Sequence, residues 1–154
     1  PVTVTSSEMT RFMMSLRQAV NLIFTATNMM EGGEVFVFKM RSVKIDNLAR
    51  ALIKDYSEHT PLAKAVTIKY TKPRPGEKFH EELLSVQERE RVVETRDLLI
   101  LLPLLNPPYQ KLPHSLESKA KRINYEEYIS HNCVMSPEEL NRFIKDNNLG
   151  CQEL

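Results

Sequence analysis

The pattern of apolar positions predicts five short β-strands. Val and Thr alternate over Pro1–Thr5, as they do in a strand with one buried face, and Glu34–Met40 is apolar enough for a buried strand. Three more apolar runs have the length of strands: Ala65–Tyr70, Arg91–Thr95 and Leu98–Leu102. The predicted strands therefore recur along the first two thirds of the chain.

Between these strands, apolar residues recur every three to four positions, which is the spacing of an amphipathic helix. The first helical pattern starts at a polar cap in Ser6–Glu8 and ends near Gly32. The apolar positions of the second lie within Ile45–Ile53, and either Ser42 or Asp46 could start this helix. Each of these helices is expected to bury one face.

Two further helices are predicted closer to the C-terminus. Lys78–Ser85 forms a short one. The other begins at Ser136-Pro137-Glu138-Glu139, which combines a capping side chain, a proline at the first helical position and acidic residues in the first turn. This C-terminal helical segment spans about 136–147, and Gly150 is suited to its end.

The order of strand, helix, strand, helix, strand predicts an α/β fold with sheet strands covered by helices on at least one face. The 154 residues, of which 42% are apolar, suffice for one core, so we expect a single domain over 1–154. A dinucleotide-binding half needs a glycine-rich turn between a strand and a helix. The only adjacent glycines, Gly32 and Gly33, follow a predicted helix and precede a strand, so no such half is predicted.

Charge and hydropathy narrow the possible partners. The 21 basic and 20 acidic residues leave a formal charge of +1, which argues against a nucleic-acid binder. The longest apolar run, Leu98–Leu105, contains Pro103 and is shorter than the roughly 18 to 20 residues of a membrane-spanning helix. Because the N-terminus also lacks the features of a signal peptide, we expect a cytoplasmic protein.

Residues that commonly bind metals are too dispersed to predict a metal site. The two cysteines, Cys133 and Cys151, do not form a C-x-x-C pattern. The four histidines are scattered, and none has the H-E-x-x-H spacing that places two ligands on one helical face. We therefore expect two reduced thiols and no metal.

Two basic motifs are candidates for binding an anion. Arg11 lies at the start of the first predicted helix, where free N–H groups and the helix dipole favour negative charge. A guanidinium there can hold a phosphate through two parallel hydrogen bonds. The alternative is an exposed arginine that pairs with Glu8.

The second motif is Arg74-Pro75-Gly76-Glu77-Lys78. A turn restricted by proline holds its charged side chains with little entropy left to lose when a ligand binds. Such a turn would present Arg74 to a diphosphate and Glu77 to the vicinal hydroxyls of a ribose. The alternative is a solvated charged turn without a ligand.

Five motifs occur in a fixed order: Pro1–Thr5, Met9–Met13, Gly33–Val37, Val43–Ala49 and Arg74–Leu83. Together with the ending Met135–Leu140, they resemble the C-terminal part of the nucleotide-sugar dehydratases and epimerases of polysaccharide biosynthesis. These enzymes belong to the extended short-chain dehydrogenase/reductase superfamily. The resemblance implies the substrate-binding part of a Rossmann-type α/β enzyme, without its dinucleotide-binding half.

Within this family the chain resembles capsule-type proteins similar to UDP-N-acetylglucosamine 4,6-dehydratase, and a UDP-glucose 4-epimerase is the alternative. The resemblance implies that Arg11 and Arg74 hold the diphosphate of a UDP-sugar and that Glu77 contacts the ribose. It also implies that NAD(P) and a Tyr-x-x-x-Lys acid/base pair belong to the missing Rossmann half. We therefore predict no catalytic or cofactor-binding residue in this chain and no activity of the chain alone.

A hypothesis of another class is a non-catalytic interaction module. Loss of a partner domain exposes apolar surface, which favours association. The chain would then form a homo-oligomer or pair with a separate Rossmann subunit.

Overall fold

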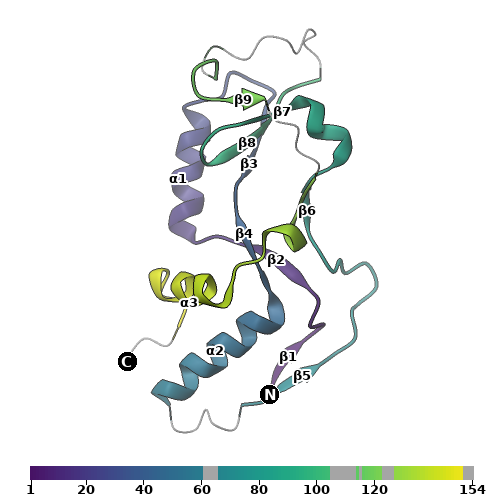
Figure 1. Ribbon diagram of the computed structural model, residues 1–154, viewed down its shortest axis with the longest axis vertical. Helices are drawn as coiled ribbons and strands as arrows, with labels where there is room; N and C mark the ends of the chain where they lie inside the picture. Colours follow the sequence, from purple (N-terminus) through teal and green to yellow (C-terminus); the bar gives the residue numbers. More distant parts are fainter. Residues whose placement is uncertain (61–65, 105–113, 115, 123–126, 151–154) are drawn as a thin grey trace. The chain divides into compact units, whose positions relative to one another are not determined.

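The computed structural model describes residues 1–60, 66–104, 114, 116–122 and 127–150 (Figure 1). Its contacts divide the chain into two compact units. Unit 1 consists of Pro1–Met13, Arg41–Glu81 and Ser130–Leu154, and unit 2 of Met14–Met40 and Glu82–Ile129, in each case as far as they are described. Each unit is thus assembled from segments that are distant in the sequence. The expectation of a single domain stays a prediction.

Unit 1 contains two pairs of short strands. β1 (Val2–Val4) pairs in parallel with β5 (Ile68–Tyr70). β2 (Thr10–Met13) pairs in antiparallel fashion with β4 (Arg41–Lys44). Both N-terminal strands are therefore held by later segments of the chain.

Helices complete unit 1. α2 (Ile45–His59) follows β4 without a loop, and the 3-10 segment η3 (Ser130–Cys133) precedes α3 (Pro137–Asp146). Apolar side chains of α2, α3 and the neighbouring segments form one core, in which Val43, Met135, Leu140 and Ile144 are buried and Met13, Leu48, Ala51, Leu52 and Phe143 pack against them. The apolar faces predicted for these two helices thus pack into the same core.

Unit 2 is built on a four-stranded antiparallel sheet with the order β3-β8-β7-β9. In that order the strands are Val35–Phe38, Leu98–Leu101, Val92–Glu94 and Lys121–Arg122. The remaining elements of this unit are α1 (Leu16–Thr27), β6 (Glu82–Leu84), the 3-10 helix η2 (Val86–Arg91) and β10 (Tyr128–Ile129). β6 pairs with β10.

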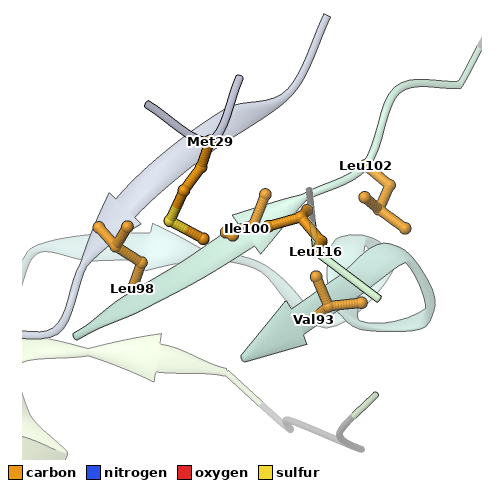
Figure 2. Close-up of a cluster of buried hydrophobic side chains, with 6 residues drawn as sticks. All are labelled: Met29, Val93, Leu98, Ile100, Leu102 and Leu116. Carbon is orange, nitrogen blue, oxygen red and sulfur yellow. The ribbon is translucent and has the colours of Figure 1, made fainter. Parts of the chain in front are cut away.

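The core of unit 2 is apolar. Figure 2 shows its buried side chains gathered in one cluster: Met29, Val93, Leu98, Ile100, Leu102 and Leu116. Leu22 of α1 and Phe36 and Phe38 of β3 pack against this cluster. The sheet and α1 therefore share one hydrophobic interior.

Most predicted elements are confirmed. The strands expected at Pro1–Thr5, Glu34–Met40, Arg91–Thr95 and Leu98–Leu102 are β1, β3, β7 and β8. The strand expected to end at Tyr70 is β5, and the first residue of its predicted range lies outside the described residues. The helix expected over about 136–147 is α3, with the predicted cap at Ser136. The chain has the expected mixture of helices and strands, although most of its described strand pairs are antiparallel.

The predicted start of the first helix is wrong. Thr10–Met13 is strand β2, and α1 begins only at Leu16. The N-cap Ser15 accepts a hydrogen bond from the Gln18 N–H, and the Gln18 side chain bonds back to the Ser15 backbone. This capping box fixes the boundary. Apolar spacing alone misses it, because a short strand before a helix can continue the same spacing.

Two other boundaries also differ from the predictions. Ser42 lies in β4, and α2 begins at Ile45 without a side-chain cap. The helix predicted over Lys78–Ser85 is wrong, because Glu82–Leu84 is strand β6. In both places the strand depends on pairing with a distant segment, which local propensity does not report.

α3 ends in a Schellman motif and not at Gly150. Asn148 has a φ of 51°. Its N–H bonds to the Lys145 carbonyl at 3.2 Å, and the Leu149 N–H bonds to the Ile144 carbonyl at 3.0 Å. Asparagine reaches this left-handed conformation more readily than most residues, so it takes the position expected of glycine.

Candidate functional site

The Arg74–Glu77 segment is a type II turn in unit 1. Pro75 occupies its second position and Gly76 its third, with a φ of 83° that a type II turn requires there. The Arg74 carbonyl accepts the Glu77 N–H at 3.1 Å. In return, the Glu77 carboxylate accepts the Arg74 N–H at 2.9 Å. The predicted turn is therefore closed by two reciprocal hydrogen bonds.

Both charged side chains of this turn are exposed. The Arg74 guanidinium forms no hydrogen bond or ion pair within the described part of the chain. One Glu77 oxygen is engaged by the turn itself, which orients the carboxylate. The turn thus holds an available cation beside an oriented anion.

Arg11, the other predicted site residue, lies on β2 with its side chain 26% exposed. Its Nη1 donates to the carbonyls of Thr10 at 2.8 Å and Phe79 at 3.2 Å. Its Nη2 donates to the Lys78 carbonyl at 2.8 Å, and its Nε lies 3.4 Å from a Glu81 oxygen. Arg11 is therefore attached to the segment that directly follows the turn.

These contacts change the basis of the Arg11 prediction. Because Arg11 is in a strand, no helix dipole acts at this position, and that part of the argument is wrong. The alternative partner is wrong as well, since Glu8 lies 3.5 Å from the Lys44 ammonium and Arg11 pairs with Glu81.

Three fully buried hydroxyl residues of unit 1 form a hydrogen-bonded cluster: Thr10, Ser42 and Ser130. Thr10 Oγ1 and Ser130 Oγ are 2.6 Å apart, and the Ser42 hydroxyl donates to the Ser130 carbonyl. Within the described residues no buried side-chain nitrogen or oxygen lacks a hydrogen-bond partner. The cluster is thus fully satisfied, as a buried polar group must be to avoid a large desolvation cost.

The same hydroxyls hold the segment after the turn. The Glu81 N–H donates to Ser130 Oγ at 2.8 Å, and His80 Nδ1 lies 2.8 Å from Thr10 Oγ1. On the backbone, the Thr10 N–H donates to the Phe79 carbonyl at 3.0 Å. The segment Phe79–Glu81 is therefore attached to both β2 and η3.

A second polar cluster holds the segment before the turn. The Tyr70 hydroxyl donates to the Asp46 carboxylate, and Arg50 donates to Asp46 at 2.8 Å and to the Tyr70 oxygen at 3.0 Å. Hydrogen bonding to Arg50 holds the pKa of Asp46 below its usual value, with Tyr70 acting in the same direction against the effect of burial. The same pairing raises the pKa of Arg50. The exposed turn is thus flanked by two anchored ends.

Sequence reasoning identified the turn but missed the residues that anchor it. Thr10, His80 and Ser130 are single polar residues in different motifs. Nothing in their local sequence announces that they meet, because the contacts join positions up to 120 residues apart. The one indication in the sequence of a buried hydroxyl is Thr10, a polar residue close to the apolar positions of the first predicted helix.

The predicted thiols are only partly described. Cys133 is free and partly buried, and burial raises the pKa of its thiol while Arg41 opposes the shift. Cys151 lies outside the described residues. Among the residues that are described, no three His, Cys, Asp or Glu side chains are grouped so that they could hold a metal ion. No described helix has both the length and the apolar character needed to cross a membrane.

Comparison with known proteins gives one family and several relatives. The model of a family described as polysaccharide biosynthesis protein matches residues 1–103. A protein of Methanocaldococcus jannaschii, named as an uncharacterized membrane protein, is 38% identical over 104 residues, which are 67% of this chain and 31% of that protein. The UDP-glucose 4-epimerase of Rickettsia rickettsii is 30% identical over 131 residues, covering 85% of this chain and 36% of the epimerase.

A dehydratase and a solved structure extend the comparison. The inverting UDP-N-acetylglucosamine 4,6-dehydratase of Campylobacter jejuni is 30% identical over 119 residues, or 77% of this chain and 33% of the enzyme. The crystal structure of Pen from Bacillus thuringiensis superposes with a TM-score of 0.80 at 30% identity, covering 96% of this chain and 42% of Pen. The chain thus spans less than half the length of each of these relatives.

Proposed function

Because the chain belongs to the polysaccharide biosynthesis protein family, we propose that it is the UDP-sugar-binding portion of a nucleotide-sugar 4,6-dehydratase that acts in surface polysaccharide synthesis. A relative named UDP-N-acetylglucosamine 4,6-dehydratase and one named UDP-glucose 4-epimerase both support a UDP-linked sugar. The corresponding portion of a 4-epimerase is the alternative. The two activities would share the nucleotide that this chain is proposed to hold.

The observation that carries the proposal is the anchored turn at Arg74–Glu77. Its backbone is fixed by reciprocal hydrogen bonds, so little entropy is lost when a ligand binds. A free guanidinium can form two parallel hydrogen bonds to phosphate oxygens, which assigns the diphosphate to Arg74. The second oxygen of the Glu77 carboxylate can accept hydrogen bonds from vicinal ribose hydroxyls.

Arg11 was expected to hold the diphosphate as well. Its Nη1 and Nη2 groups already donate to three backbone carbonyls, and a direct phosphate contact would have to replace those bonds. We therefore assign Arg11 to support the Lys78–Phe79 backbone beside the diphosphate. In this role it acts on binding through the position of the turn.

The glycines of the described segments do not fit the phosphate-binding turn of a nicotinamide cofactor. Gly32 and Gly33 lie between α1 and β3, in the order helix then strand, and Gly76 belongs to the substrate turn. When bound by the rest of such an enzyme, NAD(P) supplies hydride transfer at the sugar. The part proposed for this chain is to fix the nucleotide and so to orient the hexose, and the chain alone is expected to be inactive.

Titration calorimetry of the chain with UDP, UDP-N-acetylglucosamine and NADP tests the proposal. We expect both UDP ligands to bind and NADP not to bind. Arg74→Ala should weaken UDP binding by about 10-fold or more, because a hydrogen bond to a charged group contributes roughly 1.5–3 kcal/mol. The control Arg96→Ala removes the same charge from a side chain of unit 2 that is 95% exposed. Wild-type affinity in Arg74→Ala would contradict the assignment.

One observation favours a second function, that of an interaction module. α1 exposes four large apolar side chains on one side, namely Leu16, Val20, Ile23 and Phe24. A homodimer, or a separate Rossmann subunit, would cover them. Sedimentation velocity over a wide concentration range distinguishes the two functions, because this one predicts a concentration-dependent mass without UDP binding. A monomer that binds UDP would exclude it.

A further inference from the structure

We propose that the buried hydroxyls of Thr10 and Ser130 are positioning residues for the nucleotide-binding turn, acting through the backbone of Phe79–Glu81. The inference rests on the proposed function of the turn, which it deepens. Neither side chain is exposed, so neither can touch a ligand. Their influence must pass through the segment that they hold.

The contacts attach this segment, which directly follows the turn, to β2 and η3. Glu81 is bonded to Ser130 through its N–H, and Phe79 is bonded to Thr10 through its carbonyl. Arg11, the neighbour of Thr10, holds the Lys78 carbonyl, and Lys78 follows Glu77. A shift of β2 or η3 would therefore move the end of the turn that carries the ribose-binding carboxylate.

Two opposite arrangements of protons satisfy these hydrogen bonds, since Ser130 Oγ can donate to the Thr10 hydroxyl or to the Thr10 carbonyl, and the donor distances favour the first. Ser130 Oγ accepts the Glu81 N–H, so its own proton is available to Thr10 Oγ1, which at 2.6 Å is closer than the Thr10 carbonyl at 3.3 Å. Thr10 then donates its proton to His80 Nδ1 at 2.8 Å. In this arrangement His80 Nδ1 is an acceptor. Each hydroxyl donates once and accepts once, which gives the chain of bonds a single direction.

This chain of hydrogen bonds contributes more to the position of the Phe79–Glu81 backbone than to the stability of the fold. Replacing both partners of a buried hydrogen bond by apolar groups of the same shape is often nearly neutral for stability, whereas a directional hydrogen-bond chain specifies one geometry. Here the chain joins β2 and η3 to the segment after the turn. Removing one hydroxyl would leave its partners unsatisfied and release that segment.

Two substitutions at one position separate the hydroxyl from the volume. Thr10→Val keeps the shape and removes the hydroxyl, while Thr10→Ser keeps the hydroxyl and removes a buried methyl group. We expect Thr10→Val to weaken UDP binding about 10-fold and Thr10→Ser to stay within about 2-fold of wild type, by analogy with the loss of one hydrogen-bonding partner. Both variants should lose thermal stability, Thr10→Ser because it loses a buried methyl group and Thr10→Val because it leaves His80 and Ser130 without their hydroxyl partner.

Affinity and stability are therefore expected to separate, which a merely structural role would not produce. Amide hydrogen exchange gives a second readout that needs no ligand: Thr10→Val should speed exchange at Glu77 and Glu81, and Thr10→Ser should not. Wild-type exchange and affinity in Thr10→Val would overturn the inference, as would equal losses in both variants.

The exchange readout also separates the two proposals. If the wild-type chain fails to bind UDP, the proposed function fails, and the exchange rates at Glu77 and Glu81 still decide whether Thr10 positions the turn. Should Thr10→Val not fold, His80 supplies a second pair. His80→Asn retains an acceptor near the place of Nδ1 and should preserve slow exchange, while His80→Leu removes it and should speed exchange; identical rates in the two variants would overturn the inference.

Discussion

The interiors of the two units differ in kind. Unit 2 is filled by a cluster of aliphatic side chains and Met29. In unit 1 a smaller apolar core lies alongside buried hydroxyls, and all three fully buried polar residues in the described part of the chain belong to this unit. The candidate site residues are also in unit 1. The difference suggests that apolar packing supplies stability, whereas buried polar contacts fix the backbone that binds the ligand.

The largest expected effect is in the core of unit 2. Leu98 is fully buried, and Leu98→Ala should lower the free energy of unfolding by about 3 kcal/mol through lost transfer energy and a residual cavity. The control Leu104→Ala changes a residue that is 60% exposed and should cost less than about 0.5 kcal/mol. Urea denaturation measures both. The folded fraction of Leu98→Ala should bind UDP normally, and weaker binding there would break the comparison.

A buried hydroxyl of unit 1 should affect both properties. Ser42→Ala leaves the Ser130 carbonyl without its side-chain donor and should cost about 1–2 kcal/mol of stability. Because Ser130 also holds Glu81, UDP binding should weaken in the same variant. Ser7→Ala, at an exposed position, is the control. Denaturation and calorimetry on one sample would show whether the two losses occur together, and a stability loss with normal affinity would separate Ser42 from the site.

The contrast between the units also explains what the sequence could predict. The strands of unit 2's sheet core follow from local apolar runs, since Leu98–Leu101 is buried at every position. β2 and β4 of unit 1 were missed because each is a four-residue strand that can be recognised only from its pairing with the other. A local pattern reports burial well and distant pairing poorly.

The candidate site divides in the same way. The turn at Arg74–Glu77 was predictable, because proline and glycine determine its type by their own backbone preferences. The environment of Arg11 was not, because the carbonyls that it binds follow the turn and are brought to it by the fold. Every residue has a backbone carbonyl, so the amino-acid sequence does not indicate which carbonyls Arg11 binds. Only the structure shows these contacts.

A smaller comparison concerns two helix caps. Ser136 caps α3 in unit 1 and Ser15 caps α1 in unit 2, each in a capping box. Ser15→Ala should cost about 1 kcal/mol. Ser136→Ala should cost somewhat more, because its box partner Glu139 also accepts a hydrogen bond from Arg41 at 2.7 Å and so ties the cap to β4. Thermal denaturation of both variants gives the order, and a larger loss in Ser15→Ala would contradict the role of Arg41.

The smallest effect depends on pH. Hydrogen bonding to Arg50 depresses the folded-state pKa of Asp46, so its contribution to stability is fully present above the unfolded value near 3.8 and is lost as pH falls through the folded value. Asp46→Asn lacks this contribution at every pH. The stability difference between wild type and Asp46→Asn should therefore be constant near neutral pH and shrink below about pH 4. Asp97→Asn in unit 2, where the carboxylate is 60% exposed, makes the same charge change as a control. Urea denaturation at a series of pH values measures the difference, and one that grows toward acid pH would reverse the sign argued for Asp46.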